Sequence, residues 1–413
     1  MHLLPVSSWP MHFRYRISPR LVWVLGAFSL FYTLTLLYCR STSYRDPSSV
    51  FFDPSRAYGH QYSAHRAAQA EEYITSISRS GRHKVDHDEP PLICLGIATV
   101  ARRGTQYVRT TVGSLFAGLS QDERDSIFFD FLIGHTDPAK HPVFAEHWLD
   151  VLPDRILQYP NDTAELDQLR IWEEGGWYRN KSIHDYRYLL EDCFDTGAHY
   201  IAMVEDDTLA VEGWFRRLLN ALTLIRLKKD GARSGQHWLY LRLFYTDDLL
   251  GWNSEQWPTY LFWSFDVWVF LLTVLLTTRR RFPSQLEFFT NEVVAVIALV
   301  CIPAMIILVF LAGKQTTMPM RPGVQEMNKY GCCSQGFVFP RDVVPHVLDK
   351  LRIETKGLVD MQIEKIADAG GFVRWAIVPP VLQHMGATSS KGYGFDDNAR
   401  RIWSFRFEEY PYD

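Results

Sequence analysis

Net charge and cysteine are both scarce in this sequence, and each shortage excludes a class of protein. The 43 lysines and arginines nearly balance 47 aspartates and glutamates, which leaves a net charge of −4 and no indication of nucleic-acid binding. Only six cysteines occur in 413 residues, and they follow no metal-binding spacing. Because 47% of the residues are hydrophobic, the chain is not disordered and can bury one large core or two moderate ones.

Charged residues are absent from residues 21–39, which are long and apolar enough to span a bilayer core of about 30 Å. Three arginines, at positions 14, 16 and 20, precede this run. No clear small-residue cleavage pattern follows it, so we interpret it as a retained signal anchor. The positive-inside rule then places residues 1–20 in the cytosol and the chain after residue 39 on the luminal side.

Two further apolar runs, residues 258–278 and 293–312, predict a transmembrane hairpin. The loop between them, 279–292, begins with three arginines and therefore fits the cytosolic side. Residues before and after the hairpin would then share the luminal side and could form one domain. The alternative, two buried helices of a soluble protein, conflicts with runs of about 20 residues that stay almost uncharged on every face.

Two residues within the hairpin are exceptions to its apolar character. Asp266 lies between Trp263 and Trp268 in the luminal third of its run, so we expect it at the membrane interface. Pro303 is expected to kink the other helix, which membrane helices tolerate.

The assigned luminal region also carries features typical of the secretory pathway. Cys39 and Cys301 belong to apolar runs, and the other four cysteines lie where disulfides are permitted. These four are Cys94, Cys193, Cys332 and Cys333, and their spacing does not determine how they pair. Glycosylation sequons begin at Asn161 and Asn180, in the same region.

Outside the apolar runs, strands alternate with helices. Residues 40–90 are polar and indicate a stem followed by a helix, and the ordered domain is expected to begin at residue 91. Apolar strands are predicted at 91–100, within 127–138 and before residue 205, with helical patterns between them. This alternation predicts an α/β domain with a mostly parallel sheet flanked by helices, in two parts, 91–257 and 313–413. Ligands are then expected at the carboxyl ends of the strands.

One of these strands ends in three consecutive acids, Glu205, Asp206 and Asp207. A turn is one interpretation, because Asp is favoured where strands end. A metal site is the other. Strand alternation would place Glu205 and Asp207 on one side, where their oxygens could bind Mn²⁺ or Mg²⁺ and so hold the phosphates of a nucleotide-sugar.

Two arginines at the end of the first strand could serve the same ligand. Arg102 and Arg103 could bind the nucleotide from a neighbouring loop, although a solvated loop would also explain them.

The order of five segments resembles a known enzyme group, the GT-A glycosyltransferases, which include the N-glycan N-acetylglucosaminyltransferase IV enzymes. The segments are "TVARRGTQYVRTTVGSL", "NKSIHDYRYLLEDC", "YIAMVEDDTLA", "CCSQGFVFP" and "QHMGATSS". A hairpin inserted in the catalytic domain more closely resembles the Golgi transferases that add N-acetylgalactosamine to GPI anchors. The resemblance covers roughly residues 90–413 and implies a GT-A-like fold.

The resemblance also implies roles for individual residues. Glu205, Asp206 and Asp207 match the acidic donor-site motif, with Asp207 in direct contact with Mn²⁺ or Mg²⁺. His384 matches the place where such enzymes often bring a late His or Asp to the metal and diphosphate, and a purely structural role is the alternative. The segment "GCCSQGFVFP" looks like the turn and strand on the acceptor side.

A base is needed to take the proton from the acceptor hydroxyl in an inverting transfer. Asp360 and Glu364 lie at positions i and i+4 of a predicted helix, hence on one face. We select Asp360 as the base, and the alternative is an ordinary acid at a helix start.

The implied reaction is transfer of N-acetylgalactosamine from a UDP-sugar to a mannose of the GPI anchor of already anchored proteins, in the Golgi lumen. The alternatives are an N-glycan branching N-acetylglucosaminyltransferase and a non-catalytic membrane scaffold that binds sugar. The donor sugar stays open, since no sugar-selecting residue could be matched.

Overall fold

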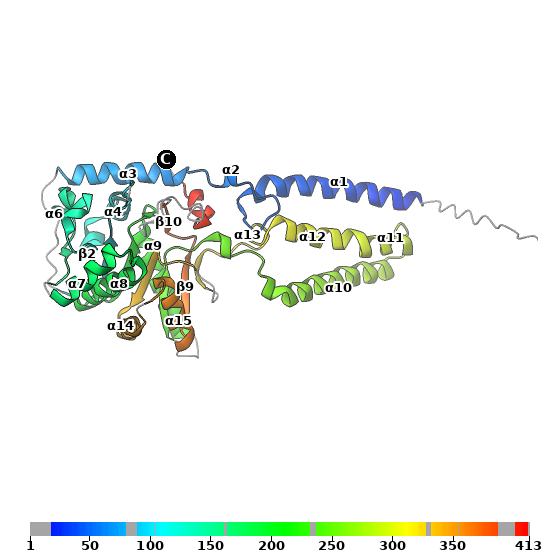
Figure 1. Cartoon of the computed structure of the whole chain (residues 1–413). Coiled ribbons are helices and arrows are strands. Elements are labelled where there is room, and N and C mark those ends of the chain that lie inside the picture. Colours follow the sequence, from blue (N-terminus) through cyan, green and yellow to red (C-terminus); the bar gives the residue numbers. More distant parts are fainter. Residues whose placement is uncertain are drawn as a thin grey trace, which may run out of the picture. The chain divides into compact units, whose positions relative to one another are not determined.

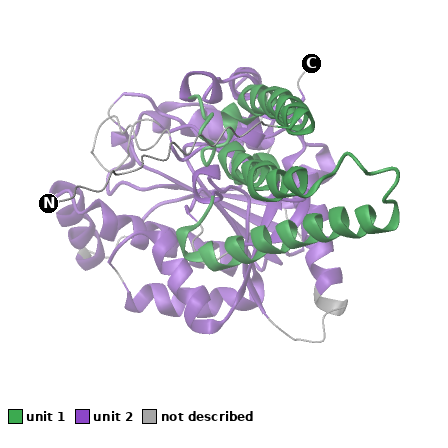
Figure 2. Cartoon of the chain, turned by 90° about the vertical axis from the view of Figure 1, so that its right-hand side faces the viewer, with its two compact units in different colours: residues 1–53, 252–317 green, residues 54–251, 318–413 purple. Residues whose placement is uncertain are grey.

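A computed structural model describes residues 18–79, 89–102, 104–160, 163–231, 237–327, 332–354, 356–386 and 401–411. The chain forms two compact units, shown in Figure 2. Residues 1–53 and 252–317 make up the first, which we call the helical unit. Residues 54–251 and 318–413 make up the second, which we call the sheet unit.

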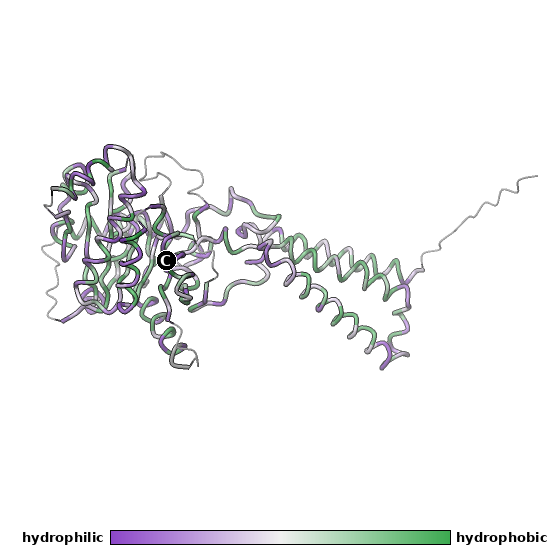
Figure 3. Tube along the Cα trace, turned by 60° about the horizontal axis from the view of Figure 1, so that its bottom comes forward, coloured by the Kyte–Doolittle hydropathy of each residue, from purple (hydrophilic) through white to green (hydrophobic). Residues whose placement is uncertain are grey.

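The helical unit contains three helices that are long and apolar enough to cross a membrane, among the residues that the structure describes. They are α1 (Pro19–Thr42), α10 (Trp257–Arg281) and a composite helix built from α11 (Asn291–Val296), a π-helical turn (Ile297–Cys301) and α12 (Ile302–Ala312). Figure 1 shows the composite helix between α1 and α10. We call α10 and the composite helix the hairpin, and Figure 3 shows that it is mostly hydrophobic along its length. The short helix α13 (Lys314–Thr317) completes the unit.

The π-helical turn ends two residues before Pro303, where the sequence predicts a kink. Proline has no N–H to donate to a carbonyl of the preceding turn. The indole nitrogen of Trp268, on α10, donates instead to the carbonyl oxygen of Ala298 at 2.7 Å. This bond joins the two arms of the hairpin at a point where water is scarce in a membrane. Asp266 is exposed on α10, and its place at the membrane interface stays a prediction.

The chain after α1 is hydrogen-bonded to the residues that follow α12. The carboxylate of Asp46 accepts hydrogen bonds from the backbone N–H of Ser48 at 2.9 Å and of Thr316 at 2.8 Å. Gly313 has φ +94°, and an added Cβ there would collide with the Asp46 carboxylate. The contact therefore requires glycine, and it ties the N-terminal helix to the hairpin.

The sheet unit is built on an eight-stranded mixed sheet of order β3-β2-β1-β4-β8-β6-β9-β7. In chain order these strands are β1 (Ile93–Thr99), β2 (Ile127–Ile133), β3 (Arg155–Leu157), β4 (Tyr200–Glu205), β6 (Trp238–Arg242), β7 (Gly323–Glu326), β8 (Gly336–Pro340) and β9 (Val373–Val378). A two-stranded sheet pairs β5 (Thr208–Ala210) with β10 (Leu382–His384). Strands β3, β2, β1 and β4 are parallel as expected, whereas β8 is antiparallel to both of its neighbours and β7 to β9. Strand β9 is also parallel to β6, so six of the eight strands run in one direction and β7 and β8 run against them. The expectation of a mostly parallel sheet therefore holds, with two antiparallel strands added.

Alternating side chains of the strands separate the core into two layers. Leu95 and Ile97 of β1 pack with α3 (Tyr62–Ile77), α4 (Val108–Phe116) and α9 (Trp214–Gly231). Cys94 faces the opposite layer, with α8 (Tyr178–Asp195), α14 (Val344–Ile353) and α15 (Val359–Gly370). The other α-helices described in the sheet unit are α2 (Pro54–Ala57), α5 (Gln121–Asp125), α6 (Trp148–Val151) and α7 (Thr163–Glu174).

The helix α3 lies within the segment that the sequence assigns to a stem, yet its side chains Tyr62 and Ile74 are buried in the core. The folded unit therefore begins well before residue 91. The helix carries enough apolar residues on one face to join the core, although its overall composition is polar.

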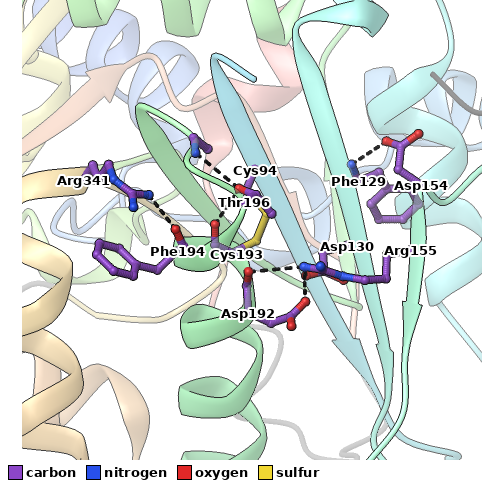
Figure 4. Close-up of a disulfide and its surroundings, with 11 residues drawn as sticks. Cys94, Phe129, Asp130, Asp154, Arg155, Asp192, Cys193, Phe194, Thr196 and Arg341 are labelled. Carbon is purple, nitrogen blue, oxygen red and sulfur yellow. Dashed lines mark hydrogen bonds and ion pairs between the residues drawn. A yellow bond between two sulfur atoms is a disulfide. The ribbon is translucent and has the colours of Figure 1, made fainter. Parts of the chain in front are cut away.

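The disulfides resolve the cysteine pairing that spacing left open. Cys94 on β1 is bonded to Cys193 on α8, with Cα atoms 5.5 Å apart (Figure 4). Beside it, Arg155 pairs with Asp130 at 2.9 Å and with Asp192. Cys332 and Cys333 are bonded to each other. Of the two sequon asparagines, Asn161 lies outside the described residues, and Asn180 is half-buried in the first turn of α8.

Candidate active site

The three acids lie where β4 leaves the sheet. Asp206 and Asp207 form a turn between β4 and β5, so the turn interpretation is correct for the backbone. The buried hydroxyl of Thr111 on α4 donates to the carbonyls of Asp206, at 2.8 Å, and Thr208, at 2.7 Å. Because strand geometry ends at Glu205, the predicted alternation does not continue through the acids.

Arg102 joins the two aspartates. Its guanidinium donates to both oxygens of Asp206, at 2.7 and 2.6 Å, and to Asp207 Oδ2 at 3.1 Å. The arginine is only 7% exposed. Burial lowers the pKa of Arg102, but the two carboxylates outweigh it and the net pKa is raised. Asp206 is therefore neutralised within the protein rather than presented to a ligand.

A hydrogen-bond chain fixes the orientation of Asp206. The hydroxyl of Thr99, at the end of β1, donates to Asp206 Oδ2 at 2.6 Å. His141 Nε2 lies 3.1 Å from the same hydroxyl, and His141 Nδ1 accepts from the backbone N–H of Val143. Burial lowers the pKa of His141 to about 4, so the imidazole is neutral and Nε2 carries the proton.

His384 reaches the same turn from the far end of the chain. Strand β10 pairs with β5 so that His384 lies opposite Thr208, and the N–H of Met385 donates to the carbonyl of Asp207 at 2.8 Å. His384 Nε2 is 3.6 Å from Asp207 Oδ2. Burial lowers the pKa of His384, but the charge of Asp207 outweighs it and the net pKa is raised.

Gly386 leaves space beside this pair. A Cβ at Gly386 would lie 2.6 Å from Asp207 Oδ2 and 3.1 Å from His384 Nε2. A carboxylate oxygen and an imidazole nitrogen beside a residue without a side chain fit a small divalent ion such as Mn²⁺.

Glu205 is directed elsewhere. Its carboxylate accepts a hydrogen bond from the hydroxyl of Ser334, and its backbone N–H donates to the carbonyl of Gln335 at 3.1 Å. The structure thus brings Asp207 to His384 and Arg102, and Glu205 to the segment 332–335.

Asp360, the proposed base, lies on the other side of that segment. Its carboxylate and the sulfur atoms of Cys332 and Cys333 all lie within 4.8 Å of one another. The segment 332–335 therefore lies against both the end of β4, at Glu205, and the start of α15, at Asp360.

Glu364 is committed to a buried ion network. Arg242 pairs with it at 2.7 Å and Arg374 at 2.9 Å, and the hydroxyl of Tyr240 also donates to it. Arg242, fully buried, donates in addition to the carbonyl of Cys333 at 2.6 Å. Two arginines and a hydroxyl thus occupy the Glu364 carboxylate within the protein. It is better suited to positioning the segment 332–335.

Sequence reasoning named some of these residues and missed others. Arg102, the three acids, His384, Asp360 and Glu364 occupy the region just described, and Arg103 lies outside the described residues. Missed were Thr99, Ser334, Arg242 and Gly386. Only Arg242 had a local signal, a charge inside the apolar run "WLYLRLF".

A comparison with protein families adds independent information. The model of the family described as GPI-N-acetylgalactosamine transferase PGAP4 matches residues 93–383. The match extends from β1 to β10 and includes the helices α10, α11 and α12. No curated protein matches the chain. Since the family model covers well over half of the sequence, the chain belongs to the GPI-N-acetylgalactosamine transferase family.

Proposed function

We propose that this transferase takes N-acetylgalactosamine from UDP-N-acetylgalactosamine and adds it to a mannose of a GPI anchor in the Golgi lumen. The sheet unit would be a GT-A-like catalytic domain. The observation that carries the proposal is the convergence of Arg102, Asp207 and His384 at the carboxyl end of β4. Ligands of open α/β sheets bind at such strand ends.

The charge of the turn argues for a cation on the donor side. Arg102 supplies one positive charge against the three carboxylates, so the turn keeps a net negative charge that would repel a nucleotide diphosphate. Asp207 and His384 would hold Mn²⁺ or Mg²⁺ in the space beside Gly386. When bound, such an ion offsets the negative charge of the departing diphosphate.

Asp360 would act as the base on the acceptor side. The acceptor oxygen attacks the anomeric carbon while its proton passes to the Asp360 carboxylate, and the bond from that carbon to the diphosphate breaks. Arg242 and Glu364 hold the segment 332–335 next to Asp360. One displacement of this kind inverts the anomeric centre, and positioning supplies much of the acceleration.

The helical unit suits an acceptor that is itself anchored in a membrane. The chain passes between the two units at residues 53–54, 251–252 and 317–318, so the sheet unit is tethered three times to apolar helices. Arginines 279–281 favour a cytosolic position for the hairpin loop and hence a luminal sheet unit.

The test is mass spectrometry of GPI glycans and N-glycans from cells that lack the protein and are rescued with variants. Wild type should restore one N-acetylhexosamine on the GPI glycan, and Asp207→Asn should not. Asp248→Asn, the same substitution at an exposed acid, is the matched control and should behave as wild type. Rescue by Asp207→Asn would overturn the donor site, and loss of N-glycan branching with unchanged GPI glycans would overturn the proposed acceptor.

A further inference from the structure

Two buried polar atoms near the end of β4 have no hydrogen-bond partner within the described part of the chain. They are the hydroxyl of Tyr186, on α8, and the side-chain oxygen Oε1 of Gln335, which is 3% exposed. Native proteins satisfy the great majority of buried polar groups, so two such atoms at one place call for an explanation. A ligand that supplies the missing hydrogen bonds is one.

Strand register places Gln335 on the face of Glu205. In the antiparallel pair of β4 and β8, Met203 is opposite Phe337 and Val204 opposite Gly336, so Glu205 is opposite Gln335. The bond from Glu205 N–H to the Gln335 carbonyl continues this pairing. Opposite residues of an antiparallel pair project to the same side.

The helix α8 covers that side. Met203, two residues before Glu205, belongs to the core layer that contains Leu189 of α8, and the ring of Tyr186 packs against the same layer. Burial raises the pKa of Tyr186, the charge of Glu205 raises it further and that of Arg242 opposes them. Tyr186, Gln335 and Glu205 therefore share one region, held in shape by Arg242 through Cys333.

The chemistry of this set matches a polyol. Gln335 Oε1 and the Glu205 carboxylate accept hydrogen bonds, and the Tyr186 hydroxyl both donates and accepts. A sugar ring offers several hydroxyls that do the same. Glu205 lies two residues from Asp207, where the donor diphosphate is proposed to bind, so a hexose joined to that diphosphate, or accepting from it, would lie nearby.

We propose that Tyr186 and Gln335 bind hydroxyl groups of a sugar ring beside Glu205 and thereby help to select the sugar. The proposal rests on the donor site of the proposed function. The ring belongs either to the N-acetylhexosamine of the donor or to the mannose of the acceptor, and kinetics distinguish the two.

The decisive variant is Tyr186→Phe in the full-length enzyme. Since the lost hydroxyl has no partner among the described residues, its removal should leave the thermal unfolding midpoint unchanged or raise it. Sugar binding should nevertheless weaken about tenfold in KM, which equals about 1.4 kcal/mol. Gln335→Met should have a similar effect. Tyr188→Phe is the matched control on the same helix, because that hydroxyl donates to the Gln158 carbonyl at 2.9 Å, and its loss should leave KM unchanged.

Two assays identify the ring. If the ring belongs to the donor, Tyr186→Phe raises KM for the hydrolysis of UDP-N-acetylgalactosamine in the absence of acceptor. It also reduces the preference of the enzyme for this donor over UDP-N-acetylglucosamine. If it is the acceptor's, hydrolysis is unchanged and KM for the GPI-anchored acceptor rises. Wild-type constants in both assays for Tyr186→Phe and Gln335→Met would overturn the inference, provided that Asp207→Asn is inactive. An active Asp207→Asn would overturn the proposed donor site instead.

Discussion

Replacing Gly386 with alanine tests whether donor diphosphate and metal bind beside Asp207 and His384. The added Cβ would lie 2.6 Å from Asp207 Oδ2, whereas ordinary contact begins at 3.4 Å, so the carboxylate would have to move by about 0.8 Å. A misplacement of about 1 Å in an active site costs roughly 100-fold in rate. We therefore expect kcat/KM to fall about 100-fold, or about 2.7 kcal/mol of transition-state stabilisation.

The assay is transfer from UDP-N-acetylgalactosamine to a GPI-anchored acceptor by the purified full-length enzyme, at a series of Mn²⁺ concentrations. The variant should need more Mn²⁺ for half-maximal activity. The fold should survive, because Gly386 has no positive φ and the collision is with the end of a side chain. A thermal unfolding midpoint near that of wild type would show this.

Gly26→Ala is the matched control, since nothing lies within 4 Å of an added Cβ at that position in α1. It should leave kinetics and Mn²⁺ dependence unchanged. If Gly386→Ala folds and also keeps wild-type kcat/KM and Mn²⁺ dependence, the donor and its metal do not bind beside Asp207 and His384, and our reasoning is refuted.

Three further predictions concern stability. The pKa of His141 is lowered from 6.5 to about 4 in the folded protein, so between these pH values the unfolded chain binds more protons than the folded one. The free energy of unfolding should therefore be highest above pH 6.5 and fall as the pH drops toward 4. His141→Gln should flatten this dependence when unfolding by denaturant is measured from pH 4 to 8. Trp268→Phe removes the donor to the Ala298 carbonyl and should destabilise the helical unit by about 1–2 kcal/mol in detergent unfolding, and an unchanged midpoint would show that the bond is not needed. Alanine at both Cys94 and Cys193 opens a link across 99 residues and should lower the free energy of unfolding by about 4–5 kcal/mol, unless the reduced wild type proves equally stable.

Local patterns were enough to predict the apolar helices and the strand before the acids. A run without charge predicts a membrane-spanning helix from its own length, and an apolar segment followed by acids predicts a strand that ends at the surface. The structure contains both, at α1, α10 and α12 and at β4. The sequence placed α3 in the stem because this helix is polar on average. Only its packing showed that one face of the helix belongs to the core.

The composition of the candidate site depended on contacts between distant segments. Arg102 and Asp206 are 104 positions apart, and Glu205 and Ser334 are 129 apart, so no periodicity within either segment reports these contacts. The alternation predicted for Glu205 and Asp207 did not apply because the strand ends at Glu205 and a turn follows. The antiparallel entry of β8 between β4 and β6 likewise has no local signal.

By itself, the sequence determined which segments are apolar enough for a membrane, that the two parts of an α/β domain precede and follow the hairpin along the chain, and which acids follow a strand, because these properties depend on neighbouring residues. Tertiary structure alone decided that Asp207 meets His384, that Asp206 is neutralised by Arg102, and that Glu364 is held between Arg242 and Arg374. The physical reason is that the charge and proton affinity of a buried carboxylate depend on its partners in space, which the chain brings together only on folding.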